Sequence, residues 1–299
     1  MVPIVLFVYK RTDTLAKTLN CLKSNDIPLL IVYSDGAKGN ADRAGVTAVR
    51  QMINQIDWCQ VELHVRENNM GLGRNIMTGV TEVLEKHECC IVFEDDLVCV
   101  PGTYAYLCAA LEHYKNDPRV YSVTGWTNKF ITPPTVKNNP YFDGRAECMT
   151  WGIWRRSWRG MDSESALEKM YHAQSEGIDP YSYGGDLPYM AKTEQVKNIW
   201  AVRLVYHHIA NRGLCFRPPW SMVNHIGWGI DSTNAAIKNW EDNGELAPAP
   251  PIPTDWPIPI EEPGSASLHR KMYKRPWVDI FPRLVPIARG ILKALHIKY

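Results

Sequence analysis

The sequence predicts an α/β fold in which a mostly parallel, Rossmann-like sheet is flanked by helices. In residues 1–125, short apolar runs of strand length alternate with segments whose apolar residues recur every three or four positions. This alternation is typical of βαβ units, which build parallel sheets with helices on both faces. The chain has 299 residues, which is enough for one large domain or two modest ones.

Five apolar runs are the expected strands of this first half: residues 3–9, 28–33, 61–65, 90–93 and 120–124. Helical spacing of apolar residues predicts helices at about residues 15–22, 46–56 and 76–84. A further helix is expected from Pro101 through about residue 114, because proline suits the first turn of a helix, where its missing N–H costs no hydrogen bond.

The regular alternation stops near Gly125, and the rest of the chain divides into three parts. Residues 126–246 begin as a loop, continue as helical and extended pieces, and are expected to complete the same domain. Residues 247–268 are rich in proline, which predicts a linker or a surface wrap.

Residues 269–299 form a basic tail, in which Lys and Arg far outnumber the single acid Asp279. Ile287, Ile291 and Leu295 recur there at helical spacing. A basic amphipathic helix suits an anionic membrane surface, and it suits docking on the domain through its apolar face equally well. Both interpretations of the tail stay open.

The composition argues against several classes of protein. A formal net charge of +1 gives no indication of nucleic-acid binding. No apolar run approaches the roughly 20 residues of a membrane span. The 8 cysteines lack the C-x-x-C spacing of zinc sites. A reduced, cytoplasmic location is expected, peripheral at the inner face of the membrane if the tail binds lipid.

Residues 90–96 (CIVFEDD) run from an expected buried strand directly into three carboxylates. In open α/β sheets, ligands bind beyond the carboxyl ends of the strands. Neighbouring acids repel one another and call for a compensating cation, and hard oxygen ligands favour Mg²⁺ or Mn²⁺ shared with substrate phosphates. The alternative for an isolated acidic triplet is a solvated turn.

Several motifs occur in a particular order: FVYKR at residues 7–11, SDG at 34–36, NMGLGRN at 69–75, EDD at 94–96, WGIWRRSW at 151–158, RP at 217–218 and SMVNHIG at 221–227. With these motifs, residues 3–230 resemble the GT-A-type nucleotide-sugar glycosyltransferases. The resemblance is to the group related to the Golgi N-acetylglucosaminyltransferase that starts complex N-glycans, and to small bacterial polysaccharide-assembly glycosyltransferases.

The resemblance implies a metal-dependent inverting glycosyltransferase that moves a sugar from a nucleotide-diphosphate donor to a glycan hydroxyl. The implied donor is a UDP-sugar, with UDP-GlcNAc as one candidate, and the acceptor is a glycan or lipid-linked glycan in polysaccharide or glycoconjugate assembly. Mn²⁺ or Mg²⁺ would stabilise the leaving diphosphate. Residues 1–125 would then be the nucleotide-sugar-binding half and residues 126–246 the acceptor-side half.

Two other functions stay open. A nucleotidyltransferase that makes nucleotide sugars shares the sheet and the metal, but its glycine-rich phosphate loop would follow the first strand, where this chain has KRTD at residues 10–13. A non-catalytic carbohydrate-binding protein could share the fold, although it would have no need of an intact acidic triplet.

The resemblance assigns the donor side residue by residue. Asp96 is implied to ligate the metal, and Glu94 and Asp95 to contact ribose, sugar or metal-bound water; Glu94 could instead only brace the loop. Arg11 and Asp35 are implied to contact the nucleotide, against the alternatives of a surface ion pair and a simple Asp-Gly turn.

Arg74 is implied to face the phosphates, unless it is merely exposed at a helix start. Trp151 and Trp154 are implied to form an acceptor or sugar platform, with burial in the core as the alternative. His225 could help to hold the metal or diphosphate, or it could be a hydrogen-bonded structural histidine.

An inverting transfer needs a carboxylate that accepts the proton of the acceptor hydroxyl. By the family pattern this general base is Asp186, which follows Gly184 and Gly185. Glu194 and Asp179 are the fallbacks. The alternative for Asp186 is a helix N-cap.

Overall fold

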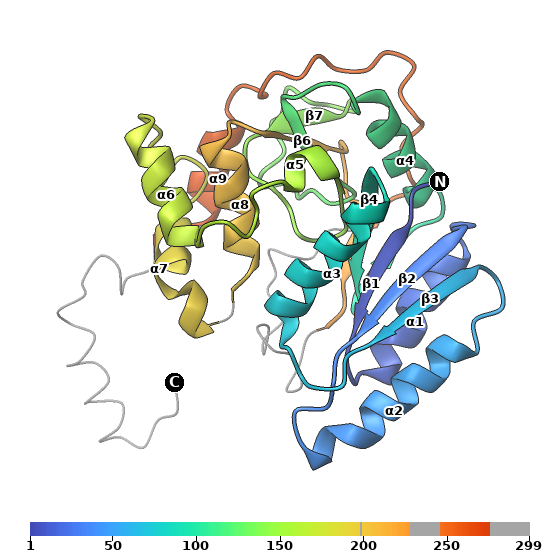
Figure 1. Cartoon of the computed structure of the whole chain (residues 1–299). Helices are drawn as coiled ribbons and strands as arrows, with labels where there is room; N and C mark the ends of the chain where they lie inside the picture. The colour runs from blue at the N-terminus through green and yellow to red at the C-terminus, as the bar shows by residue number, and fades with distance from the viewer. Residues whose placement is uncertain (198, 228–245, 276–299) are drawn as a thin grey trace, which may run out of the picture.

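The chain folds around one large mixed sheet, as the sequence predicts (Figure 1). The computed structural model describes residues 1–197, 199–227 and 246–275. Within them, an eight-stranded sheet has the order β3-β2-β1-β4-β8-β6-β9-β7. Its strands are β1 (Ile4–Val8), β2 (Leu29–Ser34), β3 (Gln60–Val65), β4 (Cys89–Glu94), β6 (Val120–Thr124), β7 (Tyr141–Asp143), β8 (Trp151–Trp154) and β9 (Leu214–Arg217).

Most strands of this sheet point the same way. Strands β3, β2, β1 and β4 pair in parallel, and β8 runs antiparallel to both β4 and β6. Strand β6 therefore has the direction of β4, and β9 pairs in parallel with β6. The carboxyl ends of these parallel strands meet at one edge of the sheet, which we call the carboxyl edge. Ligand sites of open α/β sheets lie at this edge.

Helices cover both faces of the sheet, and the pleat of each strand explains how. Along β1, Ile4, Leu6 and Val8 pack on one face, whereas Val5 and Phe7 pack on the other. A strand buried on both faces is apolar at every position, as β1 is. The helices are α1 (Thr12–Lys23), α2 (Asn40–Asn54), α3 (Leu72–Lys86), α4 (Thr103–His113), α5 (Arg155–Trp158), α6 (Ala166–Ser175), α7 (Leu187–Lys197), α8 (Ala201–Ala210) and α9 (Ser265–Met272).

Helices α1, α2 and α4 contribute to the core on one face, and α3 with α5 to α8 contributes to the core on the other (Figure 1). A small second sheet joins β5 (Leu97–Cys99) to β10 (Val223–His225) in antiparallel pairing. Strand β7 lies in the segment expected to be a loop. It has only three residues and pairs with β9 at the end of the sheet, so it leaves little periodic signal in the sequence.

The structure corrects the expectation of an aromatic platform at residues 151–158. Residues Trp151 and Trp154 belong to β8, which lies between β4 and β6 in the middle of the sheet. The ring of Trp151 stacks on Trp158 at a centroid distance of 5.8 Å, and Trp154 donates its indole N–H to the carbonyl of Leu111 at 3.2 Å. Both rings are buried, because large aromatic side chains gain most when a central strand removes them from water.

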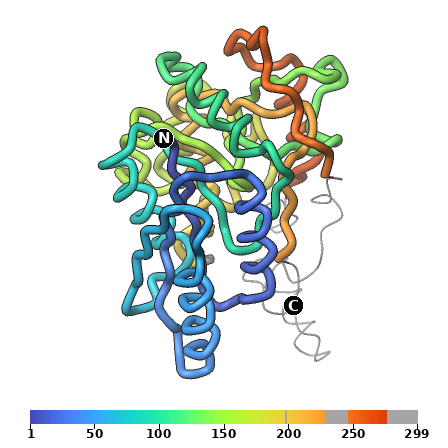
Figure 2. The backbone as a smooth tube through the Cα atoms, turned by 90° about the vertical axis from the view of Figure 1, so that its right-hand side faces the viewer, coloured from blue at the N-terminus to red at the C-terminus, as the bar shows by residue number. Residues whose placement is uncertain are grey.

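Residues 246–263 form a strap along the outside of the molecule, from the neighbourhood of α4 past β7 to α9 (Figures 1 and 2). Its main anchor is Trp256, which stacks on His113 at 4.7 Å. The hydroxyl of Tyr114 donates to the carbonyl of Pro257 at 2.7 Å. Proline suits such a segment because it needs no hydrogen bond for its own nitrogen.

Helix α9 carries the start of the basic tail into the domain. His269 is buried and contacts the carboxylate of Asp143 at 2.9 Å. Residues 276–299, which hold the expected amphipathic helix, lie outside the described residues. In the part of the chain that the structure describes, no helix combines the length and apolarity needed to cross a membrane.

Candidate functional site

The carboxyl edge gathers charged side chains from distant parts of the chain. Arg11 follows β1, and Asp95 and Asp96 follow β4, the neighbour of β1 in the sheet. His225 ends β10, which the pairing with β5 brings to the same place. Together with Glu94, the last residue of β4, the two aspartates form what we call the acidic cluster.

Arg11 bridges the two aspartates of the cluster. Its Nη2 lies 2.5 Å from Oδ1 of Asp95 and 2.6 Å from Oδ2 of Asp96. Both carboxylates are nearly buried, whereas Arg11 remains partly accessible. The guanidinium supplies the cation that adjacent buried carboxylates require.

The three acids of the cluster have different electrostatic environments. Burial, reinforced by the charges of Asp96 and Asp95, raises the pKa of Glu94 to about 8. Burial also raises the pKa of Asp95 to about 6, although Arg11 opposes it. Burial acts in the same direction on Asp96, but the hydrogen bond from His225 and the charges of His225 and Arg11 hold the pKa of Asp96 below its ordinary value. Asp96 is therefore the acid of the cluster most firmly held as a carboxylate.

His225 and Asp96 form a ligand pair that fits a divalent metal. Nε2 of His225 lies 3.1 Å from Oδ2 of Asp96, and the N–H of Ile226 donates to the carbonyl of Asp96 at 2.8 Å. Two neighbouring ligands of an octahedral Mg²⁺-like ion, each about 2.1 Å from it, are about 3 Å apart. No group of three His, Cys, Asp or Glu side chains among the described residues could hold a metal. An ion here would need further ligands, such as the phosphates and waters that complete many Mg²⁺ sites.

Gly227 lies directly against the ion pair of Arg11 and Asp96. A Cβ at this position would overlap with Oδ2 of Asp96 and crowd a guanidinium nitrogen of Arg11. The backbone can approach the ion pair only because this residue has no side chain. Gly227 belongs to the motif at residues 221–227, but no role for it is predicted from the sequence. The physical signal was a glycine two positions after a histidine expected at the site.

Asp35 lies at the carboxyl edge but has another task than the expected contact with the nucleotide. Its carboxylate accepts hydrogen bonds from the backbone N–H groups of Gly36, Met70 and Gly71, at 2.8–3.0 Å, and from the side-chain amide of Asn69 at 3.1 Å. These donors occupy both oxygens, and the side chain is buried. Asp35 thus holds the loop before α3 in place.

Arg74 lies on the first turn of α3, and its side chain is exposed. The structure places it two residues after Leu72, where the helix begins. Its expected role toward phosphates stays a prediction.

Asp186 and Glu194, two of the acids expected as general base, are both engaged by arginines. Asp186 receives two hydrogen bonds from Arg145, at 3.2 and 3.1 Å, and its side chain is 21% exposed. Glu194 is buried: Oε2 accepts from the N–H of Ala166 at 2.8 Å and Oε1 from Nε of Arg203 at 2.6 Å. Glu194 therefore links α6, α7 and α8, a structural task that leaves neither oxygen directed at an acceptor.

A buried charged network that the sequence did not predict is joined to the Arg145–Asp186 pair, because Nη2 of Arg217 donates to the carbonyl of Arg145 at 2.9 Å. Nε of Arg217 contacts Asp143 at 2.5 Å, its Nη1 lies 3.4 Å from Glu147, and His269 also contacts Asp143. Burial acts to raise the pKa of Asp143, but Arg217 and His269 keep this pKa below its ordinary value. The signal in the sequence was Asp143, Arg145 and Glu147 alternating within a sparsely charged loop. This network joins β7, β9 and α9.

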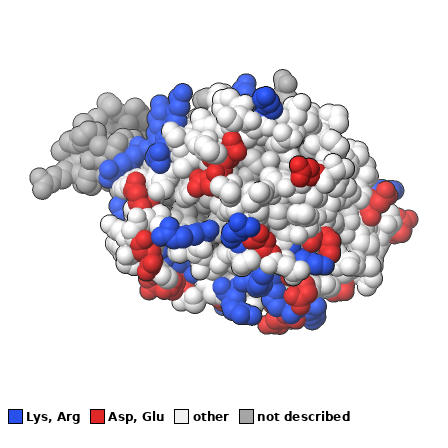
Figure 3. All heavy atoms as spheres, turned by 90° about the horizontal axis from the view of Figure 1, so that it is seen from above, with Lys and Arg blue, Asp and Glu red and all other residues white. Residues whose placement is uncertain are grey.

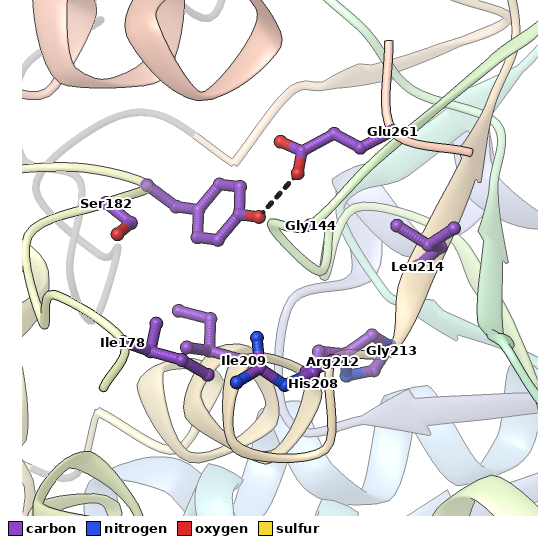
Figure 4. A pocket seen from close by; sticks show the side chains of 10 residues that line it. Gly144, Ile178, Ser182, His208, Ile209, Arg212, Gly213, Leu214 and Glu261 are labelled. Carbon is purple, nitrogen blue, oxygen red and sulfur yellow. Dashed lines mark hydrogen bonds between the residues drawn. The ribbon is translucent and has the colours of Figure 1, made fainter. Parts of the chain in front are cut away.

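A cavity of about 180 Å³ lies between the end of α8 and the start of β9, away from the acidic cluster (Figure 4). Glu261 lies across it from Ile209 and Arg212, and the hydroxyl of Tyr183 donates to Glu261 at 2.8 Å. Leu214, which begins β9, also lines it. Because β9 runs parallel to the other main strands, this cavity is at the opposite edge of the sheet from the acidic cluster.

The face of the molecule seen in Figure 3 carries Lys and Arg side chains interspersed with Asp and Glu. The described residues of this face thus form no broad basic surface of the kind that binds nucleic-acid phosphates.

Comparison with protein-family models finds no match, and comparison with curated proteins finds none either. Solved structures give weak similarities. The mannosyltransferase PcManGT from Pyrobaculum calidifontis, in complex with GDP-Man and Mn²⁺, aligns over 69% of this chain and 73% of its own at 10% identity and a TM-score of 0.40.

Residues 1–349 of S. aureus TarS align over 76% of this chain and 61% of their own, at 11% identity and a TM-score of 0.45. HddC from Yersinia pseudotuberculosis aligns over 52% of this chain and 78% of its own, at 10% identity and a TM-score of 0.34. Similarities this low carry no information about function.

Proposed function

We propose that the protein is a metal-dependent inverting glycosyltransferase that transfers a sugar from a UDP-sugar, with UDP-GlcNAc as one candidate, to a hydroxyl of a glycan. The observation that carries this proposal is the cluster of Arg11, Asp95, Asp96 and His225 at the carboxyl end of the central strand β4. It combines carboxylate, imidazole and guanidinium groups where an α/β sheet binds its ligands.

The chemistry of these groups suits a leaving nucleoside diphosphate. Asp96 and His225 would hold Mn²⁺ or Mg²⁺, which when bound supplies Lewis-acid stabilisation of the charge that develops on the diphosphate. Arg11 adds a positive charge in a planar fork that matches phosphate oxygens. A partly accessible guanidinium next to a nearly buried acid pair is available to such a ligand.

The loop that Asp35 holds is the proposed support for the nucleotide. Gly71 has a φ of 76°, a conformation that favours glycine, and it opens α3 at the carboxyl edge. Backbone placed by a buried carboxylate is rigid, and rigid backbone can lie close to a flat base or a ribose. In this proposal Asp35 acts through the loop and does not touch the nucleotide.

Asp186 is the proposed general base. Asp186 retains more contact with solvent than Glu194, and Arg145 fixes its orientation. A base must reach the hydroxyl proton, and a carboxylate held by one neighbour can still direct a lone pair elsewhere. The acceptor would be a glycan or lipid-linked glycan of polysaccharide or glycoconjugate assembly. The basic composition of residues 269–299 supports work at the inner surface of a membrane.

The test is a thermal-shift titration with UDP, GDP and dTDP, with and without Mn²⁺, on the wild type and on Asp96→Asn. Ligands that bind the native state raise the melting temperature. We expect a Mn²⁺-dependent rise with UDP in the wild type and none in Asp96→Asn. The exposed Asp57→Asn is the matched control and should behave as the wild type. No rise with any nucleotide would contradict the proposal.

A second assay separates the proposed activity from the nucleotidyltransferase alternative. Incubation with a UDP-sugar and glycan acceptors should release UDP and lengthen the acceptor. Release of pyrophosphate from a nucleoside triphosphate and a sugar phosphate would instead establish the alternative.

A further inference from the structure

Helix α1 and strand β5 contact each other at both of their ends. At one end Arg11, which immediately precedes α1, bridges to Asp96, which immediately precedes β5. At the other end Cys21, in the last turn of α1, faces Cys99, the last residue of β5. The two Sγ atoms are 3.6 Å apart, and both thiols are free.

The sulfur of Cys21 accepts two hydrogen bonds that favour its thiolate, while its thiol donates one to the carbonyl of Thr18 at 3.0 Å. Its sulfur accepts a hydrogen bond from the backbone N–H of Cys99 at 3.2 Å and a second from the Cys99 thiol. The hydrogen bond from the Cys99 thiol is the main reason that the pKa of Cys21 is lowered, against the effect of burial. By contrast, burial raises the pKa of Cys59 and Cys108 to about 11. Because the thiolate is the reactive form of cysteine, Cys21 should be more reactive than Cys59 and Cys108.

Accessibility divides the pair into two roles. Cys21 is partly exposed, whereas Cys99 is buried. The side-chain amide of Asn25 donates to Sγ of Cys99 at 3.4 Å and to the carbonyl of Val100 at 3.1 Å, and so holds the end of β5 next to α1. An external reagent therefore reaches Cys21 before it can reach the buried Cys99.

We propose that Cys21 and Cys99 form a thiol–disulfide site that reacts with a low-molecular-weight disulfide of the glutathione class. The thiolate of Cys21 attacks one sulfur of oxidised glutathione, which breaks that S–S bond, releases one glutathione thiolate and leaves a mixed disulfide on Cys21. Cys99 gives its proton to the glutathione thiolate released first and attacks Sγ of Cys21. The second glutathione leaves as a thiolate. In balance, the two protein thiols are oxidised and one glutathione disulfide is reduced to two thiols.

The bond would act on the neighbouring acidic cluster. A disulfide requires about 2.05 Å between sulfurs, so the two sulfurs must come closer than the 3.6 Å that now separates them. In the small sheet, Val223 pairs with Cys99 and His225 pairs with Leu97, so β5 also holds the histidine of the site. A cross-link would clamp α1 on β5 and keep Arg11 on the acids. If the proposed function holds, the oxidised protein should bind UDP with Mn²⁺ about tenfold more weakly.

The first test is disulfide mapping of the full-length protein by mass spectrometry after equilibration in buffers of oxidised and reduced glutathione. The wild type should form the Cys21–Cys99 bond. Cys99→Ser should stop at a glutathione adduct on Cys21, and Cys21→Ser should form neither species. The control Cys108→Ser should match the wild type. A wild type in which Cys21 and Cys99 stay reduced would overturn the proposal.

A second measurement needs no variant. In the wild type, Cys21 should react with iodoacetamide faster than Cys59 and Cys108 at neutral pH; equal or slower labelling would count against the site. Mn²⁺-dependent UDP binding is then compared in the reduced and the oxidised protein. A disulfide that forms without weakening this binding would refute the coupling to the cluster. Absence of UDP binding even in the reduced protein would refute the proposed function, while the mapped disulfide would still stand.

Discussion

Nε2 of His225 lies 3.1 Å from Oδ2 of Asp96, although the two residues are 129 positions apart in the chain. The antiparallel pairing of β10 with β5 produces this contact, since it places His225 opposite Leu97, the residue after Asp96. Because β5 directly follows the acidic cluster, the small sheet delivers an imidazole to the carboxyl end of β4.

Replacement of His225 tests whether the imidazole belongs to a metal site. We expect His225→Ala to weaken Mn²⁺ binding by about 10–100-fold, the range seen when a group that supports a metal is lost. Isothermal titration with Mn²⁺ and UDP measures the change. His172→Ala removes an exposed histidine of α6 and is the control. Unchanged affinity in His225→Ala would assign the histidine a purely structural role.

Gly227→Ala tests the close approach of the backbone to the ion pair. The added methyl group overlaps with the carboxylate of Asp96 and must displace it from Arg11 and His225. We expect about tenfold weaker Mn²⁺ affinity and a loss of about 1–3 kcal/mol in stability. Gly39→Ala is the matched control, because a Cβ there meets nothing within 4 Å. Wild-type Mn²⁺ affinity in Gly227→Ala would show that the site tolerates the displacement.

A pair of isosteric variants separates the roles of Asp186 and Glu194. Asp186→Asn should lower kcat by about 10²–10⁴-fold while Mn²⁺-dependent UDP binding stays intact, because loss of a general base affects the chemical step. Glu194→Gln should instead lower the free energy of unfolding by about 2 kcal/mol, since it weakens a charged hydrogen bond to Arg203. Steady-state kinetics and urea unfolding measure the two effects. The reverse pattern would exchange the assignments.

The buried ring of His208 should make the stability of the protein depend on pH. The carbonyl of Leu204 can only accept, so Nδ1 donates to it at 3.0 Å, and in the neutral ring Nε2 accepts from the hydroxyl of Ser122 at 2.8 Å. Burial, aided by the charge of His207, lowers the pKa of His208 to about 3. Below about pH 6.5, the ordinary pKa of a histidine, the His208 ring is protonated in the unfolded chain but stays neutral in the folded protein until the pH nears 3.

Stability should therefore fall as pH drops from about 6.5 toward 3, and at pH 5 this residue should account for about 2 kcal/mol. Urea unfolding at several pH values measures this. In His208→Gln the amide does not titrate, so the pH slope in this window should be smaller than in the wild type. Parallel slopes for the two proteins would contradict the assignment.

Much of the fold and part of the site could be predicted from local patterns. The strands at residues 4–8 and 120–124 and the helix with Ile76 and Val80 were predictable because burial imposes a period on neighbouring residues. The position of Asp95 and Asp96 at the end of a buried strand was readable for the same reason. The order of strands and helices predicts a parallel sheet, and ligands bind beyond the carboxyl ends of the strands in such a sheet.

Other features depended on which distant segments meet. The tryptophans of residues 151–158 carry no mark that distinguishes an exposed platform from a strand in the middle of the sheet, and pairing with β4 and β6 places them inside. The carboxylate of Asp35 accepts hydrogen bonds from a loop that lies more than thirty residues later in the chain. The carboxylate of Glu194 accepts hydrogen bonds from Ala166, at the start of α6, and from Arg203 of α8.

The chain thus carries its strand and helix order, and the acids that end β4, in patterns a few residues long, because hydrophobic periodicity and strand termination are local. The contacts of Asp96 with Arg11, His225 and Gly227, and of Cys21 with Cys99, come from the packing of α1, β4, β5 and β10. Partners for a polar side chain are set by the three-dimensional arrangement of segments far apart in sequence, and no local pattern contains that information.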